Sequence, residues 1–218
     1  MAASRSFSRL GSRIANMFTT SKMKSQAYGS FIVISWIPAL IFFNTHIAEV
    51  QFVNGSSMYP YLNEDHNNSL NMTCCLTYKW KPSQNLERGM LVSFWYSPAR
   101  TRLSNRIRLI NIHRSPFNPN GLAIKRVIGL EGDTVYTRSP YPYPTAVVPK
   151  NHIWVEGDNA DPNKTLDSNT YGPIALPLIQ GKITHLLSRK NFGPIPWKEF
   201  KGRTKVIQGR KEDAPRFD

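Results

Sequence analysis

Cysteine is scarce in this chain of 218 residues, which holds only two, adjacent at Cys74 and Cys75. Neighbouring cysteines cannot join distant loops, and two thiols alone do not complete a structural zinc site. The sequence therefore contains no disulfide framework. A vicinal disulfide is one arrangement open to this pair, and two free thiols in a loop are the arrangement that we expect.

Acidic residues are also few: 14 Asp and Glu stand against 28 Lys and Arg, a net charge of +14. The excess of basic residues is distributed unevenly along the chain. Residues 1–24 and 97–120 each carry five basic residues and no acidic one, and residues 181–218 are also strongly basic, so the rest of the chain is close to neutral. Nucleic-acid-binding domains spread cations over a folded face and add aromatic side chains for stacking. We therefore do not expect nucleic acid as a partner.

Charge of either sign is absent from the 24 residues between Lys24 and Glu49. Their core reads FIVISWIPALIFF, with Pro38 as its one helix breaker. About 20 mostly apolar residues suffice to cross a bilayer as a helix, and such helices tolerate proline. Residues 25–48 are thus predicted to form one membrane span. A cleaved signal peptide and a buried core helix are the alternatives, although no small-x-small cleavage site follows closely.

The segment before this span, residues 1–24, is basic, contains serine and lacks acids, as in a mitochondrial presequence. Positive flanks stay on the side of synthesis or in the matrix. The body of the protein should therefore lie across the membrane from the N-terminus. A disordered basic tail is the alternative.

Long apolar runs are lacking after the span, and 16 Pro and 13 Gly indicate many turns. Short apolar runs between turns favour a mostly β body over a helical bundle. The length suggests one domain with appendages. We expect this domain over residues 50–190 and a basic C-terminal tail over residues 191–218.

Three segments hold residues suited to catalysis. The first is NGSSMYPYLN, residues 54–63, where Gly55 permits a tight turn. A serine in such a turn can present its hydroxyl beside a backbone N–H, which suits a nucleophile with its own oxyanion donor. Gly-Ser-Ser is also common in plain turns, which is the alternative.

The second segment is KRVIGLEGD, which begins at Lys125 after an apolar run. A lysine is protonated at its reference pKa of about 10.4, but burial against apolar neighbours can lower that pKa by several units. Lys125 is then either a general base or an ordinary cation at the edge of a strand. Arg126 should point to the opposite side of the strand.

The third segment, residues 152–173, combines a strand that begins at His152 with several aspartates. The spacing of Asp158, Asp161 and Asp167 lacks the ligand pattern of a calcium loop, so we expect no metal there. Pairing of Asp158 or Asp167 with Arg126 is the better use of these carboxylates. His152 could be a base, although a histidine that opens a strand is more often structural.

In this order, just after a membrane span, the three motifs resemble the type I signal peptidase family, peptidase family S26. The motifs are Gly-x-Ser-Met-x-Pro, Lys-Arg-Val-Ile-Gly-x-x-Gly-Asp, and Gly-Asp-Asn…Asp-Ser-Asn-x-Tyr-Gly-Pro. The similarity covers about residues 50–185 and is greatest to the mitochondrial, fungal branch of the family. It implies twisted sheets that form a partly open barrel, anchored by one N-terminal helix.

The resemblance implies a serine–lysine dyad. Ser57, which directly precedes Met58, matches the nucleophile, and Lys125 matches the general base. Thr165 falls where the family has a hydroxyl that orients the lysine. A supporting salt-bridge cluster matches Arg126, Asp158 and Asp167.

This chain departs from the family pattern at several positions. Bacterial members have a second oxyanion donor, a serine hydroxyl, where this chain has Gly55. Met90 stands where the family usually has aspartate, and the third motif is two residues longer. The arginine-rich residues 97–120 resemble an insertion, read either as a solvated loop or as a contact with membrane or a partner.

The implied reaction is peptide hydrolysis without metal or organic cofactor. Implied substrates are precursor proteins with sorting presequences, bound in an extended form and cleaved in the mitochondrial intermembrane space. A sister protease subunit is the implied partner, and the Asn in Asp-Ser-Asn favours one of the two subunits. Three alternatives remain: the sister subunit itself, the endoplasmic-reticulum enzyme, in which histidine replaces Lys125, and a catalytically silent membrane-anchored scaffold.

Overall fold

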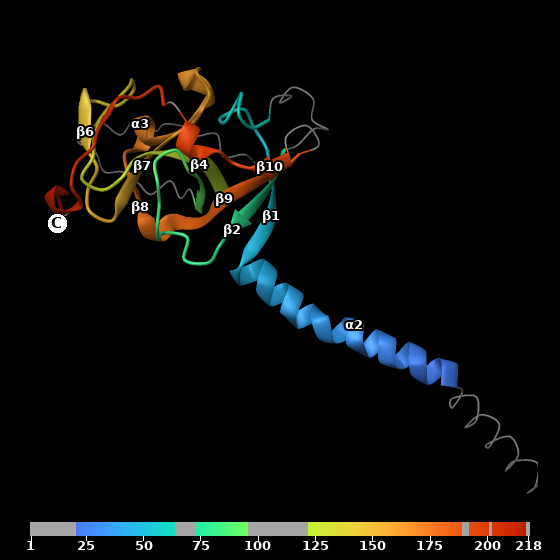
Figure 1. The fold of residues 1–218 in the computed structure, drawn as a ribbon. Helices are drawn as coiled ribbons and strands as arrows, with labels where there is room; N and C mark the ends of the chain where they lie inside the picture. The colour runs from blue at the N-terminus through green and yellow to red at the C-terminus, as the bar shows by residue number, and fades with distance from the viewer. Residues whose placement is uncertain (1–20, 64–72, 96–121, 189–191, 201, 217–218) are drawn as a thin grey trace, which may run out of the picture. The chain divides into compact units, whose positions relative to one another are not determined.

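The computed structural model describes residues 21–63, 73–95, 122–188, 192–200 and 202–216. The chain divides into two compact units, Met1–His46 and Ile47–Asp218 (Figure 1). The basic residues 1–20 and the arginine-rich residues 97–120 lie outside the described part.

The described residues of the first unit form the helix α2 (Ser21–His46), with Pro38 in its interior. Its residues 28–46 are long and apolar enough to cross a membrane, and none of that window is buried against protein. The large apolar side chains of this window are exposed, Phe31 and Trp36 among them. The helix ends two residues before the predicted limit of the span, because Ala48 already begins the first strand of the second unit.

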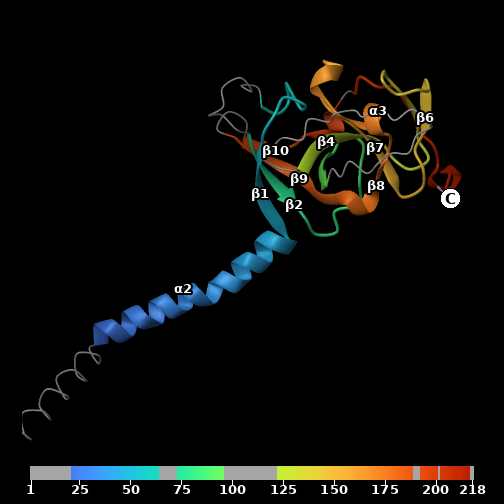
Figure 2. The same cartoon turned by 180° about the vertical axis from the view of Figure 1, so that it is seen from behind.

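The second unit is mostly β, as predicted. Its larger sheet is antiparallel and has eight strands, seven of them in the order β1-β2-β9-β3-β4-β7-β8, with β10 paired to β9 (Figure 2). Among the described strands the sheets do not close into a barrel. The strands are β1 (Ala48–Val53), β2 (Thr73–Tyr78), β3 (Leu91–Trp95), β4 (Leu122–Gly129), β7 (His152–Glu156), β8 (Ile174–Ala175), β9 (Ile179–Leu187) and β10 (Phe192–Pro194).

A smaller antiparallel sheet has the order β11-β5-β6. It consists of β5 (Thr134–Tyr136), β6 (Thr145–Val147) and β11 (Val206–Ile207). Short helical segments connect the strands: Pro162–Lys164, α3 (Ser168–Tyr171), Leu176–Leu178, Trp197–Glu199 and Lys211–Asp213.

The C-terminal segment belongs to this folded unit instead of forming a tail from residue 191. Strand β11 pairs with β5, and the backbone N–H of Ile195 donates to the carbonyl of Thr184. Farther on, the N–H of Lys150 donates to the carbonyl of Pro215. The basic composition concealed this packing, because it depends on backbone pairing and on a few apolar side chains, Ile195 and Phe200 among them.

Strand β4 occupies an interior position between β3 and β7. Its residues from Lys125 to Gly129 are all buried, because both faces of this part of the sheet are covered. Val127 packs in one apolar cluster with Val92 and Ile153, and Ile128 packs in another with Trp154. A charged side chain in this part of the strand is therefore surrounded by protein and largely shielded from solvent.

The two cysteines are free, as predicted, but they lie in strand β2 and not in a loop. Alternation along the strand sends Cys75 into the core cluster that contains Met58 and leaves Cys74 partly exposed. Burial raises the pKa of the Cys75 thiol to about 12. The thiol therefore packs as a small apolar side chain.

Candidate active site

The segment after β1 forms a tight turn that carries Ser57. Gly55 has φ of 96°, a left-handed value that an L side chain rarely adopts. The N–H of Tyr59 donates to the carbonyl of Ser56 (3.1 Å) and that of Leu62 to the carbonyl of Met58 (2.8 Å). The side chains of Met58 and Leu62 are buried in the core cluster. Met58 thus anchors the turn while Ser57 faces the site.

Strand β4 brings Lys125 to this turn. Its Nζ lies 2.9 Å from Ser57 Oγ and 3.1 Å from the carbonyl oxygen of Ile124. Only 5% of Lys125 is exposed. Burial lowers the pKa of the Lys125 amine to about 8, although the charges of Asp167 and Asp158 oppose this effect. A lysine with this pKa is partly neutral near pH 8 and can then accept the proton of the serine hydroxyl.

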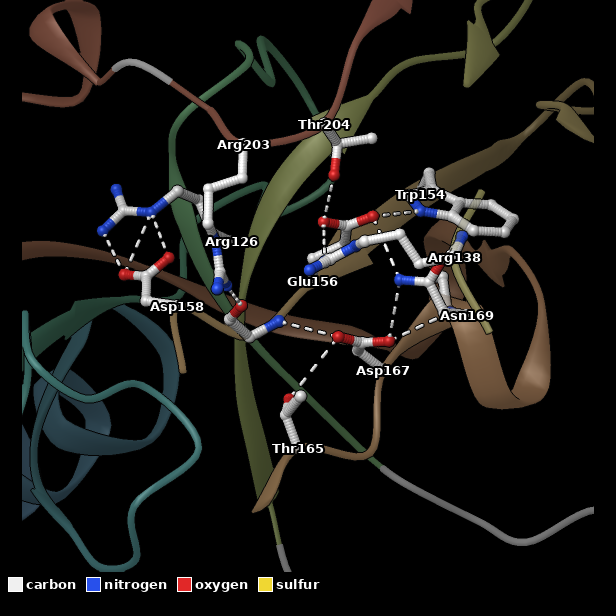
Figure 3. Close-up of polar contacts among 12 residues, drawn as sticks. Arg126, Arg138, Trp154, Glu156, Asp158, Thr165, Asp167, Asn169, Arg203 and Thr204 are labelled. Carbon is white, nitrogen blue, oxygen red and sulfur yellow. Dashed lines mark hydrogen bonds and ion pairs between the residues drawn. The ribbon is translucent and has the colours of Figure 1, made fainter. Parts of the chain in front are cut away.

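Arg126 is buried on the opposite side of β4 and pairs with Asp158. Its Nε and Nη2 donate to the two carboxylate oxygens at 2.9 and 2.6 Å (Figure 3). Nη1 donates to the carbonyl of Gly89 at 2.8 Å. The guanidinium also lies over the rings of Tyr61 and Phe200, at 4.7 and 4.1 Å from their centroids. This pair connects β4 to the turn after β7 and to the segment after Ser57.

Asp167 has different partners, so Asp158 is the aspartate that pairs with Arg126. One Asp167 oxygen accepts from the N–H of Gly157 (3.2 Å), and the other caps α3 by accepting from the N–H of Asn169 (3.0 Å). The Thr165 hydroxyl donates to Asp167 Oδ2 at 3.5 Å (Figure 3). Among the described residues, the hydrogen bond of Thr165 is with Asp167 and not with Lys125, which the family resemblance implied it would orient.

A buried polar network continues from Asp167. The Asn169 side-chain amide donates to both Asp167 and Glu156, each at 3.1 Å. Glu156 also accepts from Trp154, Arg138 and Thr204 (Figure 3). This network holds the end of β7 beside α3. No signal in the sequence indicated this network, because Arg138 and Thr204 come from separate segments without a motif.

The other candidates have structural partners. His152 Nδ1 lies 2.8 Å from the carbonyl oxygen of Lys150 and opens β7. The strand extends about 3.3 Å per residue, so His152 is about 16–17 Å along the chain from Gly157. Asp161 accepts from the N–H of Asn163 and caps the Pro162–Lys164 turn. In the described part of the chain, no three His, Cys, Asp or Glu side chains form a group that could hold a metal.

A groove of about 530 Å³ lies beside the Ser57 turn, at Pro60 and Tyr61. Its other wall comes from β9, β10 and the residues that follow. The lining is mostly apolar: Pro60, Tyr61, Leu186, Phe192, Gly193, Pro194 and Pro196.

An antiparallel β fold that follows an apolar helix in sequence, with a buried lysine in contact with a turn serine, is typical of serine peptidases of the signal peptidase I type. The family model for signal peptidase, peptidase S26, matches residues 25–140. The chain belongs to this family.

Mitochondrial relatives are similar over most of the chain. Mitochondrial inner membrane protease subunit 2 of Saccharomyces cerevisiae is 35% identical over 168 residues, 76% of this chain and 82% of the relative. The subunit 2 of Schizosaccharomyces pombe is 31% identical over 91% of this chain and 98% of its own. The human subunit 1 is 49% identical, but over only 34% of this chain and 45% of its own. The expected likeness to the mitochondrial, fungal branch is thus confirmed, and subunit 2 is the subunit that the Asp-Ser-Asn motif favoured.

Proposed function

We propose that the chain is a membrane-anchored endopeptidase in which Ser57 is the nucleophile and Lys125 the general base. The observation that carries this proposal is the 2.9 Å contact between Lys125 Nζ and Ser57 Oγ, in a site that excludes water from the amine. Neutral Lys125 accepts the hydroxyl proton while Ser57 Oγ attacks the scissile carbonyl. The backbone N–H of Ser57 stabilises the resulting oxyanion.

Collapse of the tetrahedral intermediate expels the amine product, which takes the proton from Lys125, and leaves an acyl-enzyme on Ser57. The lysine, again neutral, removes a proton from water as that water attacks the ester. Ser57 Oγ then leaves and takes this proton back from Lys125, which restores the enzyme. Both half-reactions use the same base, so one buried amine suffices. Asp158 and Arg126 support the site by joining β4 to the turn after β7.

The proposed substrates are precursor proteins whose sorting presequences are removed in the mitochondrial intermembrane space. The similarity to mitochondrial inner membrane protease subunits supports this substrate class, and the occurrence of two subunit types supports a complex with a sister subunit. We assign residues 1–24 to targeting and residues 25–48 to the membrane anchor, with the body in the intermembrane space. The groove at Pro60 and Tyr61 offers an apolar surface for part of an extended substrate.

Cleavage of a precursor by the purified complex tests the dyad. We expect Ser57→Ala and Lys125→Met each to lower kcat by at least about a thousandfold, since each removes a group that acts in bond formation. Ser56→Ala is the matched control, because its hydroxyl is not in contact with Lys125 Nζ, and it should retain most of the activity. Cleavage at the wild-type rate by either dyad variant would favour the silent scaffold alternative.

A further inference from the structure

The peptide unit between Ser56 and Ser57 is held by Asn159, a residue buried in the turn after β7. The Asn159 side-chain amide donates to the carbonyl oxygen of Ser56 at 2.7 Å, and its backbone N–H donates to that of Ser57 at 3.1 Å. A peptide unit is planar, so fixing the Ser56 oxygen fixes the direction of the Ser57 N–H. A hydrogen bond at the carbonyl also polarises the unit and strengthens its N–H as a donor.

The backbone turn that contains Asn159 is itself held by Arg203, which lies 44 residues farther along the chain. Arg203 Nη2 donates to the carbonyl oxygens of Gly157 and Asn159, at 2.9 Å each. Both carbonyls face one cation, and such charge-assisted hydrogen bonds are about twice as strong as neutral ones. The side chain thus joins the two ends of a three-residue turn.

The segment around Arg203 is itself fixed. The Thr204 hydroxyl donates to Glu156 at 2.6 Å (Figure 3). The Phe200 ring lies over the Arg126 guanidinium. The N–H of Tyr136 donates to the carbonyl of Lys205 at 3.0 Å. Contacts on either side of Arg203 therefore set where its guanidinium can reach.

The turn has little room to move toward the serine. A Cβ placed on Gly157 would lie 2.6 Å from the Ser57 carbonyl oxygen and 2.0 Å from Thr165 Oγ1. Backbone this close to the serine transmits a displacement of the turn directly to the Ser57 peptide. A misplacement of about 1 Å at a reacting group can cost about a hundredfold in rate.

We propose that Arg203 is a positioning residue for the peptidase reaction. By holding the carbonyls of Gly157 and Asn159, it fixes the amide that orients the Ser56–Ser57 peptide and, through it, the oxyanion donor. The inference rests on the proposed role of Ser57 as nucleophile. Since the oxyanion forms only during the reaction, loss of Arg203 lowers kcat and leaves KM unchanged.

The test is steady-state cleavage of a precursor by the full-length chain in complex with its sister subunit. We expect Arg203→Met to lower kcat about tenfold or more, with KM within about twofold of the wild type. Arg210→Met is the matched control on the same segment, because the Arg210 side chain is 84% exposed and its ion pair among the described residues is with Asp213. The kcat and KM of this variant should be unchanged. Arg203→Lys keeps the charge and should give an intermediate kcat.

A double-mutant cycle with Asn159→Ala separates positioning from general loss of stability. If Arg203 acts through Asn159, Arg203→Met lowers kcat little further in the Asn159→Ala background. Multiplicative effects of the two substitutions would overturn the proposal, as would an Arg203→Met enzyme that matches the Arg210→Met control. Should Arg203→Met fail to accumulate, Arg203→Lys decides: a wild-type kcat overturns the proposal, and a lowered kcat at constant KM supports it.

Ser57→Ala, measured in parallel, distinguishes a failure of the proposed nucleophile from a failure of the role of Arg203. Full activity of Ser57→Ala would contradict the proposed nucleophile and with it the role of Arg203. An inactive Ser57→Ala beside a fully active Arg203→Met would contradict the positioning role alone.

Discussion

Lys125 shows how the environment of one residue decides its chemistry. The amine is buried on an interior strand, so desolvation disfavours its charged form and lowers the pKa. The charges of Asp167 and Asp158 raise the pKa and offset part of this effect. Desolvation prevails, and the pKa falls from its usual value to about 8. Arg126, the next residue, lies on the opposite side of the strand and forms an ion pair with Asp158.

This pKa predicts the pH dependence of cleavage. Lys125 acts as a base only when neutral, so kcat/KM should rise with pH through about 8 and then level off. The pH–rate profile of the purified complex measures this rise in kcat/KM. A rise near pH 6.5, the reference pKa of histidine, would instead point to His152 as the base.

The turn Gly157-Asp158-Asn159 is the element that joins the separate parts of the site. Asp158 pairs with β4 through Arg126, Asn159 holds the Ser57 turn, and Gly157 contacts Asp167. The turn follows β7, whose pairing with β4 brings Glu156 opposite Arg126. A short backbone segment thus sets the distance between base and nucleophile.

Gly157→Ala should therefore abolish most activity. The added methyl group would overlap the Ser57 carbonyl oxygen and the Thr165 hydroxyl. We expect kcat to fall by about a hundredfold or more and the free energy of unfolding to fall by about 1–3 kcal/mol. Precursor cleavage and denaturant unfolding measure the two effects.

Gly202→Ala is the control for this substitution, because its added Cβ would make only ordinary contacts, at 3.4 Å or more. It should leave both activity and stability close to the wild type. Equal effects of the two substitutions would contradict a specific role for the Gly157 turn.

At the scale of the whole molecule, charge and hydropathy divide the chain. The basic residues 1–24 precede an apolar helix, and the mostly β unit follows directly in sequence. Cations flanking a span stay on the matrix side, which predicts a body in the intermembrane space. The order of these segments suits an enzyme that acts on precursors delivered to that side.

Protease accessibility in isolated mitochondria tests this orientation. A tag at the C-terminus should resist added protease in intact mitochondria and be digested once the outer membrane is ruptured. A matrix protein should remain protected in both samples and serves as the control. A tag that remains protected after rupture would contradict the orientation, and alkaline extraction should leave the chain in the membrane fraction.

Much of the fold and part of the site could be predicted. Turn-rich composition indicated the β body, and the charge-free run indicated the helix. The three motifs singled out Ser57 and Lys125, and the structure brings these two together. The partners of Asp167 and the contribution of Arg203 could not be predicted, because they depend on segments that no motif links.

The sequence by itself determined the apolar helix, the mostly β class, the membership of the signal peptidase family and the residues that carry its motifs, because these depend on composition and on short local patterns. Only the tertiary structure decided which aspartate pairs with Arg126, that Cys75 is a core residue, and that the basic C-terminal segment packs against the site. Each of these depends on contacts between segments far apart in the chain, and local sequence does not encode such distances.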